Sequence, residues 1–235
     1  MPNGRYQETL IIKLGGSLIV PAEGIATAYL RQFQAFIRQQ VADHQRRFFI
    51  FVGGGRVARQ YRDAGRDIVG HELTDEDLDW LGIHATRLNA HLLRTVFRDL
   101  AHPNIIKDYS VIQKPKKPVV IAAGWKPGWS TDYPAVILAQ DYQVKAIFKL
   151  SNTDYIYDKD PKLYPDARPF ERLSWGEYRA MIDESWSPGS HAPFDPIAAK
   201  LASELSLKVY YLNGHRLEML ERALHGEPFV GTLIS

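Results

Sequence analysis

The chain has 235 residues, of which 45% are apolar and 24% are charged, and these values exclude a disordered or fibrous protein. Its 29 Lys and Arg residues nearly balance 27 Asp and Glu residues, which argues against a general nucleic-acid or membrane-surface binder. The absence of cysteine excludes disulfides, Cys-based zinc sites and thiol nucleophiles. Length alone predicts one large domain or two tight lobes.

Alternation of apolar runs with amphipathic stretches sets the predicted order of elements. In chain order we expect strands at 9–14, 48–52, 118–122, 144–150, 208–212 and 230–234, and helices at 22–44, 57–65, 74–101, 131–140, 175–183, 195–205 and 217–224. The polar, proline-containing stretch 151–169 is expected to be a loop. Thr74 is the expected N-cap of the longest helix, with Asp77 at the capping-box position. This order predicts an α/β fold with a largely parallel sheet covered on both faces.

No stretch of the sequence is long and apolar enough to predict a membrane span. The longest apolar runs, 48–52 and 119–123, are far shorter than the roughly 18 residues that a span requires. Residues 1–8 are polar and hold no apolar signal-peptide core. We therefore expect a cytoplasmic protein without a membrane partner.

Two glycine clusters follow two predicted strands, in the segments 13–17 (KLGGS) and 53–59 (GGGRVAR). Glycine lets backbone amides approach a ligand closely, and a following helix adds its positive N-terminus. The arrangement therefore indicates phosphate binding. Neither cluster fits the P-loop or the dinucleotide-binding pattern.

Two further polar clusters follow predicted strands, at 124–132 (GWKPGWSTD) and 151–161 (SNTDYIYDKDP). Ser130, Thr131 and Asp132 either cap the next helix or present hydroxyls and amides to a ligand. The second cluster follows a strand at the end where open α/β sheets bind ligands.

Six segments together resemble the amino acid kinase family: KLGGS, GGGRVAR, DLDWLGIHATRLNA, PGWSTD, SNTDYIYDKDP and PFDPIAAK. Within that family they are most similar to the branch of UMP kinases of the archaeal type. The resemblance implies a three-layer α/β/α sandwich, a single domain over 1–235, with an acceptor lobe to about 130 and an ATP lobe at about 131–235. It further implies ATP-dependent phosphorylation of UMP to UDP in pyrimidine nucleotide biosynthesis, Mg²⁺ accompanying ATP, and a homo-oligomer, a hexamer built from dimers.

The same resemblance implies roles for individual residues. The catalytic residues would be Lys13, Arg59 and Lys200. The ATP-binding residues would be Gly16, Ser17, Gly55, Arg59, Ser151, Tyr157 and Asp160. The UMP-binding residues would be Gly54, Asp79, Trp125, Lys126, Pro127, Gly128, Trp129, Ser130 and Thr131. Asp79 would hold the ribose hydroxyls, either tryptophan would stack on uracil or pack within the protein, and no residue is assigned as a metal ligand.

The sequence departs from the family pattern at Tyr155, where UMP kinases usually carry glycine. We expect an ordinary backbone here, with the ring either stacking on the nucleotide base or partly occluding its pocket. Two alternatives to UMP phosphorylation remain open. One is a kinase of the same fold with another small acceptor, although the histidine that follows the triple glycine in isopentenyl phosphate kinases is absent. The other is a non-catalytic nucleotide-binding or storage protein.

Elementary charge considerations fit the implied reaction. A nucleoside monophosphate is already an anionic nucleophile at pH 7, so the reaction needs no general base. It needs cations and amides that offset the repulsion between two polyanions, about 4 kcal/mol for two unit charges 4 Å apart at an effective dielectric constant near 20. The sequence offers Lys13, Arg59 and the glycine clusters for this task.

Overall fold

The computed structural model describes residues 6–182 and 192–235. In these ranges the strands are β1 (Glu8–Leu14), β2 (Arg46–Val52), β3 (Val119–Ala122), β4 (Ala146–Ser151), β5 (Ile156–Tyr157), β6 (Pro169–Phe170), β7 (Arg172–Leu173), β8 (Lys208–Asn213) and β9 (Thr232–Ile234). The helices are α1 (Gly16–Ile19), α2 (Thr27–His44), α3 (Gly55–Val69), α4 (Asp75–Val96), α5 (Asp132–Asp141), α6 (Trp175–Met181), α7 (Pro196–Glu204) and α8 (Leu217–Leu224), with a short 3-10 helix at Gly70–Glu72.

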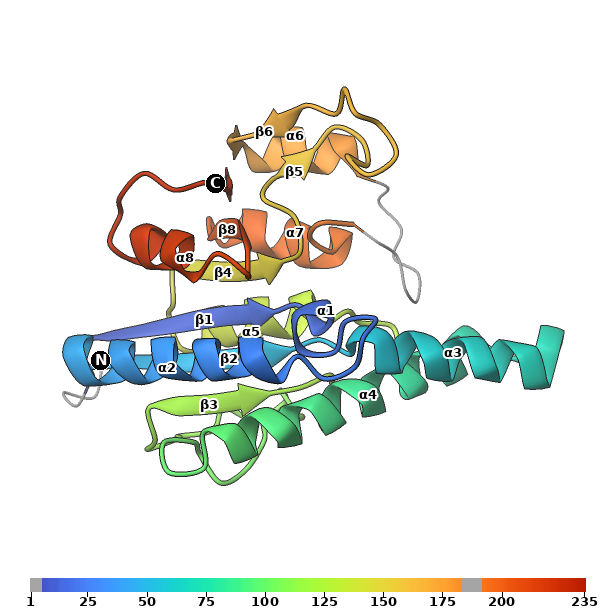
Figure 1. The fold of residues 1–235 in the computed structure, drawn as a ribbon, viewed down its shortest axis with the longest axis horizontal. Helices are drawn as coiled ribbons and strands as arrows, with labels where there is room; N and C mark the ends of the chain where they lie inside the picture. The colour runs from blue at the N-terminus through green and yellow to red at the C-terminus, as the bar shows by residue number, and fades with distance from the viewer. Residues whose placement is uncertain (1–5, 183–191) are drawn as a thin grey trace.

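The central sheet runs in the order β3-β2-β1-β4-β8-β9-β7 (Figure 1). The pairs from β3 through to β8 are parallel, whereas β9 runs antiparallel to β8. The chain proceeds from β1 outward to β2 and β3, and then returns to β4 on the other side of β1. Ligands of open α/β sheets bind at such a reversal, outside the carboxyl ends of the strands. The strand order therefore predicts a ligand site at the carboxyl ends of β1 and β4.

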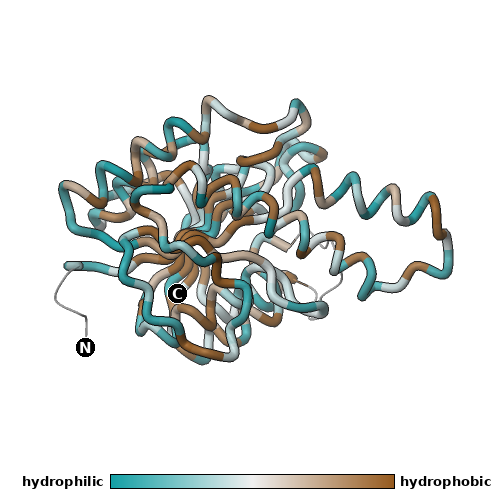
Figure 2. The backbone as a smooth tube through the Cα atoms, turned by 90° about the horizontal axis from the view of Figure 1, so that it is seen from below, coloured by the Kyte–Doolittle hydropathy of each residue, from teal (hydrophilic) through white to brown (hydrophobic). Residues whose placement is uncertain are grey.

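Two hydrophobic cores lie on opposite faces of the sheet and make the fold three-layered. Leu10, Ile12 and Leu14 of β1 join the core that contains α1, α2, α4 and α8. Ile11 faces the core that contains α5, α6 and α7. This alternation follows from the two-residue period of a strand, and burial on both faces explains the continuous apolar runs of the parallel strands. Figure 2 shows hydrophobic residues gathered along the strands in the middle of the molecule.

The predicted fold class is confirmed: the sheet is largely parallel and helices cover both of its faces. The expected cap of α4 is also present, because Thr74 and Asp77 form a complete capping box. The division of the chain into lobes near residue 130 stays a prediction. None of the helices in the described ranges has the length and apolar character to cross a membrane.

Several predicted boundaries are wrong by part of an element. Helix α2 begins at Thr27 rather than at residue 22, because Gly24 takes a positive φ of 112° that a helix does not allow. Helix α3 runs on to Val69, and together with the start of α4 it extends beyond the sheet (Figure 1). The predicted loop 151–169 contains β5 and reaches β6, which pair with each other. Residue 183, the predicted end of α6, lies outside the described residues.

Candidate active site

Two lysines of neighbouring central strands lie side by side at the reversal of the sheet. Lys13 of β1 and Lys149 of β4 are register partners in the parallel pair. Each is two residues beyond an isoleucine, Ile11 or Ile147, that belongs to the α5 side of the sheet. The strand period therefore turns both ammonium groups toward α5. Both side chains are only 11% exposed, which is rare for lysine unless a partner neutralises its charge.

The partner of both lysines is Asp132, the first residue of α5. Its Oδ1 lies 3.1 Å from Lys13 Nζ, and its Oδ2 lies 2.6 Å from Lys149 Nζ. Oδ2 also accepts a hydrogen bond of 3.1 Å from the backbone amide of Asp195. The start of a helix favours a carboxylate, so α5 helps to hold this negative charge between the two cations.

Burial and charge act in opposite directions on these groups. Burial works to raise the pKa of Asp132, but the two ammonium groups outweigh it and hold that pKa at about 2. Burial lowers the pKa of Lys13, and the carboxylate of Asp132 only partly offsets this effect. Asp132 therefore stays ionised at neutral pH. Asp195, whose amide donates to Asp132, adds a second buried carboxyl group close enough for its charge to act on Lys13 and Lys149.

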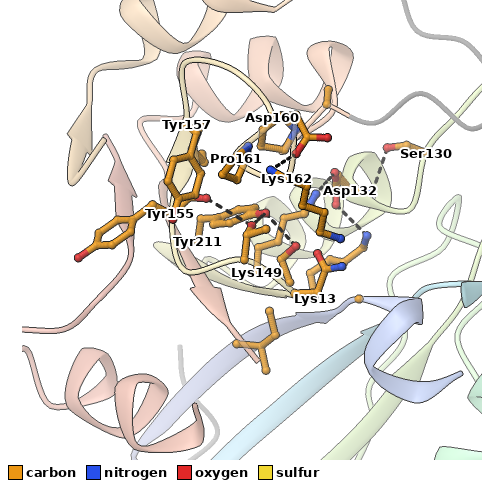
Figure 3. A pocket seen from close by; sticks show the side chains of 18 of the residues that line it. Lys13, Ser130, Asp132, Lys149, Tyr155, Tyr157, Asp160, Pro161, Lys162 and Tyr211 are labelled. Atoms are coloured by element: carbon orange, nitrogen blue, oxygen red, sulfur yellow. Dashed lines mark hydrogen bonds and ion pairs between the residues drawn. The ribbon is translucent and has the colours of Figure 1, made fainter. Parts of the chain in front are cut away.

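An open cavity of about 620 Å³ begins at this centre (Figure 3). Its lining combines Lys13, Asp132 and Lys149 with the segment after β4 and with Tyr211 of β8. In total, four lysines and two aspartates line it, so its charge suits a polyanion. The lining also contains aromatic side chains from the segment after β4. The rings of Tyr155 and Tyr157 meet edge to face, with centroids 6.3 Å apart. The cavity thus combines a cationic end with an aromatic region.

The two glycine clusters meet each other backbone to backbone beside the lysine centre. A Cβ added at Gly16 would lie 2.0 Å from the amide nitrogen of Gly55. Gly55 itself has a φ of +63°, and a Cβ there would lie 2.4 Å from the carbonyl oxygen of Gly16. Side chains are therefore excluded at both positions. The close approach of the two clusters is a structural reason for these glycines, in addition to any role in phosphate binding.

Polar side chains of α4 form hydrogen bonds with the backbone of the second glycine cluster and of the segment 124–131. Asn89 donates to the carbonyls of Gly53 and Gly54 at 2.8 and 3.1 Å. Thr86 accepts from the amide of Gly124 at 2.9 Å, and Arg87 donates to the carbonyl of Trp125 at 2.8 Å. Helix α4 therefore connects the second glycine cluster to the segment 124–131.

Asp79, near the start of α4, contacts the same segment. Its Oδ2 accepts a hydrogen bond of 2.7 Å from the amide of Gly128. Asp79 is 9% exposed, and burial raises its pKa although the Gly128 amide and the charge of Arg62 act in the opposite direction. Arg62 of α3 is partly buried and lies against α4 at Gly82. A carboxylate and a guanidinium thus lie near each other at this edge of the protein.

The tryptophans of segment 124–131 pack against each other. The rings of Trp125 and Trp129 meet edge to face at 4.7 Å, and Trp129 meets Tyr133 at 4.4 Å. The ammonium of Lys126 lies 4.7 and 4.6 Å from the two indole centroids, a range typical of cation–π contacts. The packing alternative for these tryptophans therefore has direct structural support, and stacking on a base stays a prediction.

The structure brings part of the predicted site together around the cavity. The predicted residues that line it are Lys13, Ser130, Thr131, Ser151, Tyr157 and Asp160. The predicted residues outside the lining are Gly16, Ser17, Gly54, Gly55, Arg59, Asp79, Trp125, Lys126, Pro127, Gly128, Trp129 and Lys200. Tyr155 also lines the cavity, and its φ is not positive. The expected avoidance of the left-handed region at Tyr155 is therefore confirmed.

Lys200 and Arg59 are both exposed and lie outside the cavity lining, so their catalytic roles stay predictions. Helix α7 turns its alanines into the core, so Lys200 is exposed on its outer face. Arg59 is exposed on α3, where Ala58 takes the buried position. In the structure the second lysine beside Lys13 is Lys149. The arginine near Asp79 is Arg62, one turn beyond Arg59.

Sequence reasoning missed Lys149 and the charge role of Asp132. A signal was present, because Lys149 interrupts an apolar strand two residues after Ile147, as Lys13 does after Ile11. Two such lysines on strands that become neighbours predict a shared anionic partner. Which carboxylate serves both depends on the strand order and could not be predicted from the local sequence.

The described residues do not form a dedicated metal site. No group of three or more His, Asp or Glu side chains suited to a metal ion occurs among them, and Asp132 is already engaged by two lysines. Mg²⁺ commonly binds through substrate phosphates and water with only one or two carboxylates. The cavity therefore fits a metal that enters with a polyphosphate ligand, with Asp160 at the lining as the available carboxylate.

A parallel α/β sheet with a cationic cavity at its point of reversal is the arrangement expected of a protein that binds phosphate groups. The sequence profile of the amino acid kinase family matches residues 8–213, and the chain belongs to this family. It is similar to the uridylate kinase of Methanocaldococcus jannaschii, with 33% identity over 90% of this chain and 93% of the relative. It is 32% identical to the uridylate kinase of Methanoregula boonei, over 92% of this chain and 91% of the relative.

Solved structures agree with this family membership. The uridylate kinase of Archaeoglobus fulgidus superposes with a TM-score of 0.78 at 29% identity and covers 96% of this chain and 99% of its own. The UMP kinase of Bacillus anthracis has a TM-score of 0.77 at 22% identity, covering 98% of this chain and 96% of its own, and this likeness supports the fold alone. The family predicted from the six sequence segments is confirmed.

Proposed function

We propose that this protein transfers the γ-phosphoryl group of ATP to UMP and so supplies UDP for pyrimidine nucleotide biosynthesis. The observation that carries the proposal is the buried pair of Lys13 and Lys149 on one carboxylate, at the positive end of the cavity. The names of the similar proteins, uridylate kinases, support UMP as the acceptor.

In the proposed reaction an oxygen of the UMP phosphate attacks the γ-phosphorus of ATP, and the bond from that phosphorus to the β,γ-bridging oxygen breaks. UDP and ADP are the products, and no proton must be removed because the acceptor oxygen is already ionised. Lys13 and Lys149 stabilise the charge on the transferring group and on the leaving diphosphate. Positioned charge of this kind is the main requirement of phosphoryl transfer.

Asp132 orients the two lysines in this proposal. Its ion pairs of 3.1 and 2.6 Å fix both ammonium groups at adjacent positions of the sheet. The lysines that line the cavity attract phosphate, while Asp132 keeps Lys13 and Lys149 in place. Asp132 thus acts as a positioning residue and not as a base.

ATP is assigned to the 620 Å³ cavity. Its phosphates would lie toward Lys13 and the amides of Gly16 and Ser17, with Gly55 beside them. Its nucleoside would lie among Ser151, Tyr157 and Asp160. Mg²⁺ would accompany the phosphates and neutralise part of their charge.

UMP is assigned to the side of the lysine centre that α4 and segment 124–131 border. Gly54 would approach its phosphate, and Arg62 is better placed than Arg59 to add a positive charge near Asp79. Asp79 would hold the ribose hydroxyls, which requires its carboxylate to share or release the Gly128 amide. Segment 124–131 would thereby close over the acceptor.

We also infer a cytoplasmic homo-oligomer, as the resemblance to the family implies. Helices α3 and α4 extend beyond the sheet (Figure 1) and carry exposed apolar side chains, including Ile68 at 83% and Leu88 at 62% exposure. Light scattering coupled to size exclusion tests this inference, and a monomer at micromolar concentration would contradict it.

The proposed activity is tested by ADP release from ATP and Mg²⁺ with a panel of acceptors: UMP, CMP, AMP, GMP, an acylamino acid and isopentenyl phosphate. We expect UMP to give the highest kcat/KM, with UDP as the second product. A preference for one of the other acceptors would assign another kinase of the same fold. ATP binding without turnover on any acceptor would assign a non-catalytic protein.

A further inference from the structure

A tyrosine outside the predicted site lies in the cavity wall beside the lysine centre. Tyr211 of β8 is the register partner of Lys149 in the parallel pair of β4 and β8, and it is 6% exposed. Its neighbour Tyr210 points to the opposite face of the sheet, where its ring stacks on Phe148 with centroids 4.8 Å apart. Only Tyr211 therefore reaches the cavity (Figure 3).

The hydroxyl of Tyr211 joins two residues of the segment that follows β4. It donates to Ser151 Oγ at 2.8 Å and lies 2.8 Å from Thr153 Oγ1. Because Tyr211 gives its only proton to Ser151, the proton of Thr153 must complete the contact between Thr153 and Tyr211, and the carbonyl of Tyr155, 3.3 Å from Thr153 Oγ1, is a weaker second acceptor for it. The hydrogen bonds of these hydroxyls thus run from Thr153 through Tyr211 to Ser151, with the backbone of Tyr155 beside Thr153.

The direction of these hydrogen bonds has a chemical consequence. A hydroxyl carries one proton and two acceptor lone pairs. Because Tyr211 donates to Ser151, the serine uses a lone pair in this contact and keeps its own proton. None of the hydrogen bonds found in residues 6–182 and 192–235 has Ser151 Oγ as its donor, and Ser151 lines the cavity.

We propose that Tyr211 is a positioning residue of the nucleotide site: its hydroxyl orients Ser151 as a hydrogen-bond donor toward an acceptor atom of ATP and anchors the segment 151–155. The identity of the nucleotide rests on the proposed function. Tyr211 itself need not touch ATP, because it acts through Ser151 and Thr153. Removing its hydroxyl lets Ser151 rotate and frees one anchor of the segment.

The test compares Tyr211→Phe with Tyr210→Phe, which removes a hydroxyl from the adjacent residue on the other face of the same strand. ATP affinity is measured by calorimetry without acceptor, and kcat and both KM values are measured in the coupled assay. We expect Tyr211→Phe to weaken ATP binding about five- to tenfold, the effect of one lost hydrogen bond. The KM for UMP and kcat stay within twofold of the wild type, and Tyr210→Phe binds ATP as the wild type does.

A double-mutant cycle separates orientation of Ser151 from a general loosening of the strand. If Tyr211 acts through Ser151, adding Tyr211→Phe to Ser151→Ala changes little. The Kd for ATP of the double variant should stay within about twofold of the Kd of Ser151→Ala alone. Fully additive losses would overturn the proposal. So would equal ATP affinities of Tyr211→Phe and Tyr210→Phe, or a Tyr211→Phe variant whose KM for UMP rises as much as its KM for ATP.

The calorimetric comparison also separates this proposal from the proposed function. A protein that binds ATP and shows the expected difference between Tyr211→Phe and Tyr210→Phe, yet phosphorylates no acceptor, would support the role of Tyr211 and refute the kinase activity. A wild-type protein that does not bind ATP would overturn both.

Discussion

Replacing Asp132 with Asn removes the carboxylate that forms ion pairs with both Lys13 and Lys149. At an effective dielectric constant near 20, distances of 3.1 and 2.6 Å correspond to roughly 5 and 6 kcal/mol of gross Coulomb attraction. Desolvation of the three groups offsets much of this sum, and breaking a buried pair typically costs about 3–5 kcal/mol. We therefore expect Asp132→Asn to lower the free energy of unfolding by about that amount.

Urea denaturation at pH 7 measures this loss. The matched control is Asp141→Asn at the other end of α5, where burial raises the pKa of the carboxyl, and its effect should stay within about 0.5 kcal/mol. A loss below about 1 kcal/mol for Asp132→Asn would refute the role of the carboxylate as the shared partner of both lysines.

The pH dependence of the same measurement gives a second check. The folded protein holds the pKa of Asp132 at about 2, below the ordinary 3.8. Because the pKa is lower in the folded protein, the carboxylate contributes fully to the free energy of unfolding above about pH 4. This contribution is lost as the pH falls toward 2. The difference between wild type and Asp132→Asn should therefore shrink across this range. A difference independent of pH from 5 to 2 would contradict the assignment.

Three further predictions concern the substrates. Burial lowers the pKa of Lys13, so kcat/KM for ATP should fall as the pH rises through a value below 10.5; an alkaline limb at or above 10.5 would contradict this. Asp79→Ala should raise the KM for UMP at least about tenfold, as expected for lost charged hydrogen bonds, with little change in the KM for ATP. For the same reason dUMP should be a poorer acceptor than UMP. Equal changes in both KM values would argue against ribose binding by Asp79. Tyr155→Gly should change the KM for ATP several-fold and leave that for UMP unchanged, with looser binding indicating stacking and tighter binding indicating occlusion; an unchanged ATP affinity would make Tyr155 a packing residue.

The sequence predicted the layers of this fold because parallel strands covered on both faces leave a strong local signal. Runs of three to five apolar residues mark β1, β2 and β4, and the helices between them show their period. Element ends were less predictable. Helix α1, with four residues, is too short for its period to show. The pairing of β5 with β6 depends on residues 12 and 14 positions apart in the chain, Tyr157 with Pro169 and Ile156 with Phe170.

The site was only partly predictable for a related reason. Lys13 is marked by the glycines that follow it, whereas Lys149 has no glycine beside it and stands out only as a charge within an apolar strand. Its importance follows from register, which places it opposite Lys13. Tyr211 likewise gains its contacts through its neighbour strand, and its hydroxyl bonds join residues about 60 positions apart.

The most direct test of the proposed function is ³¹P NMR of the wild-type protein with ATP, Mg²⁺ and UMP, compared with Lys149→Met and with the control Lys145→Met, which changes an exposed lysine immediately before the same strand. We expect the γ-phosphate of ATP to appear as the β-phosphate of UDP in the wild type and in Lys145→Met. The rate should be about 10²–10³ lower in Lys149→Met, the effect of losing one preorganised charge. Equal rates in all three proteins, or release of inorganic phosphate without UDP, would refute the proposed function.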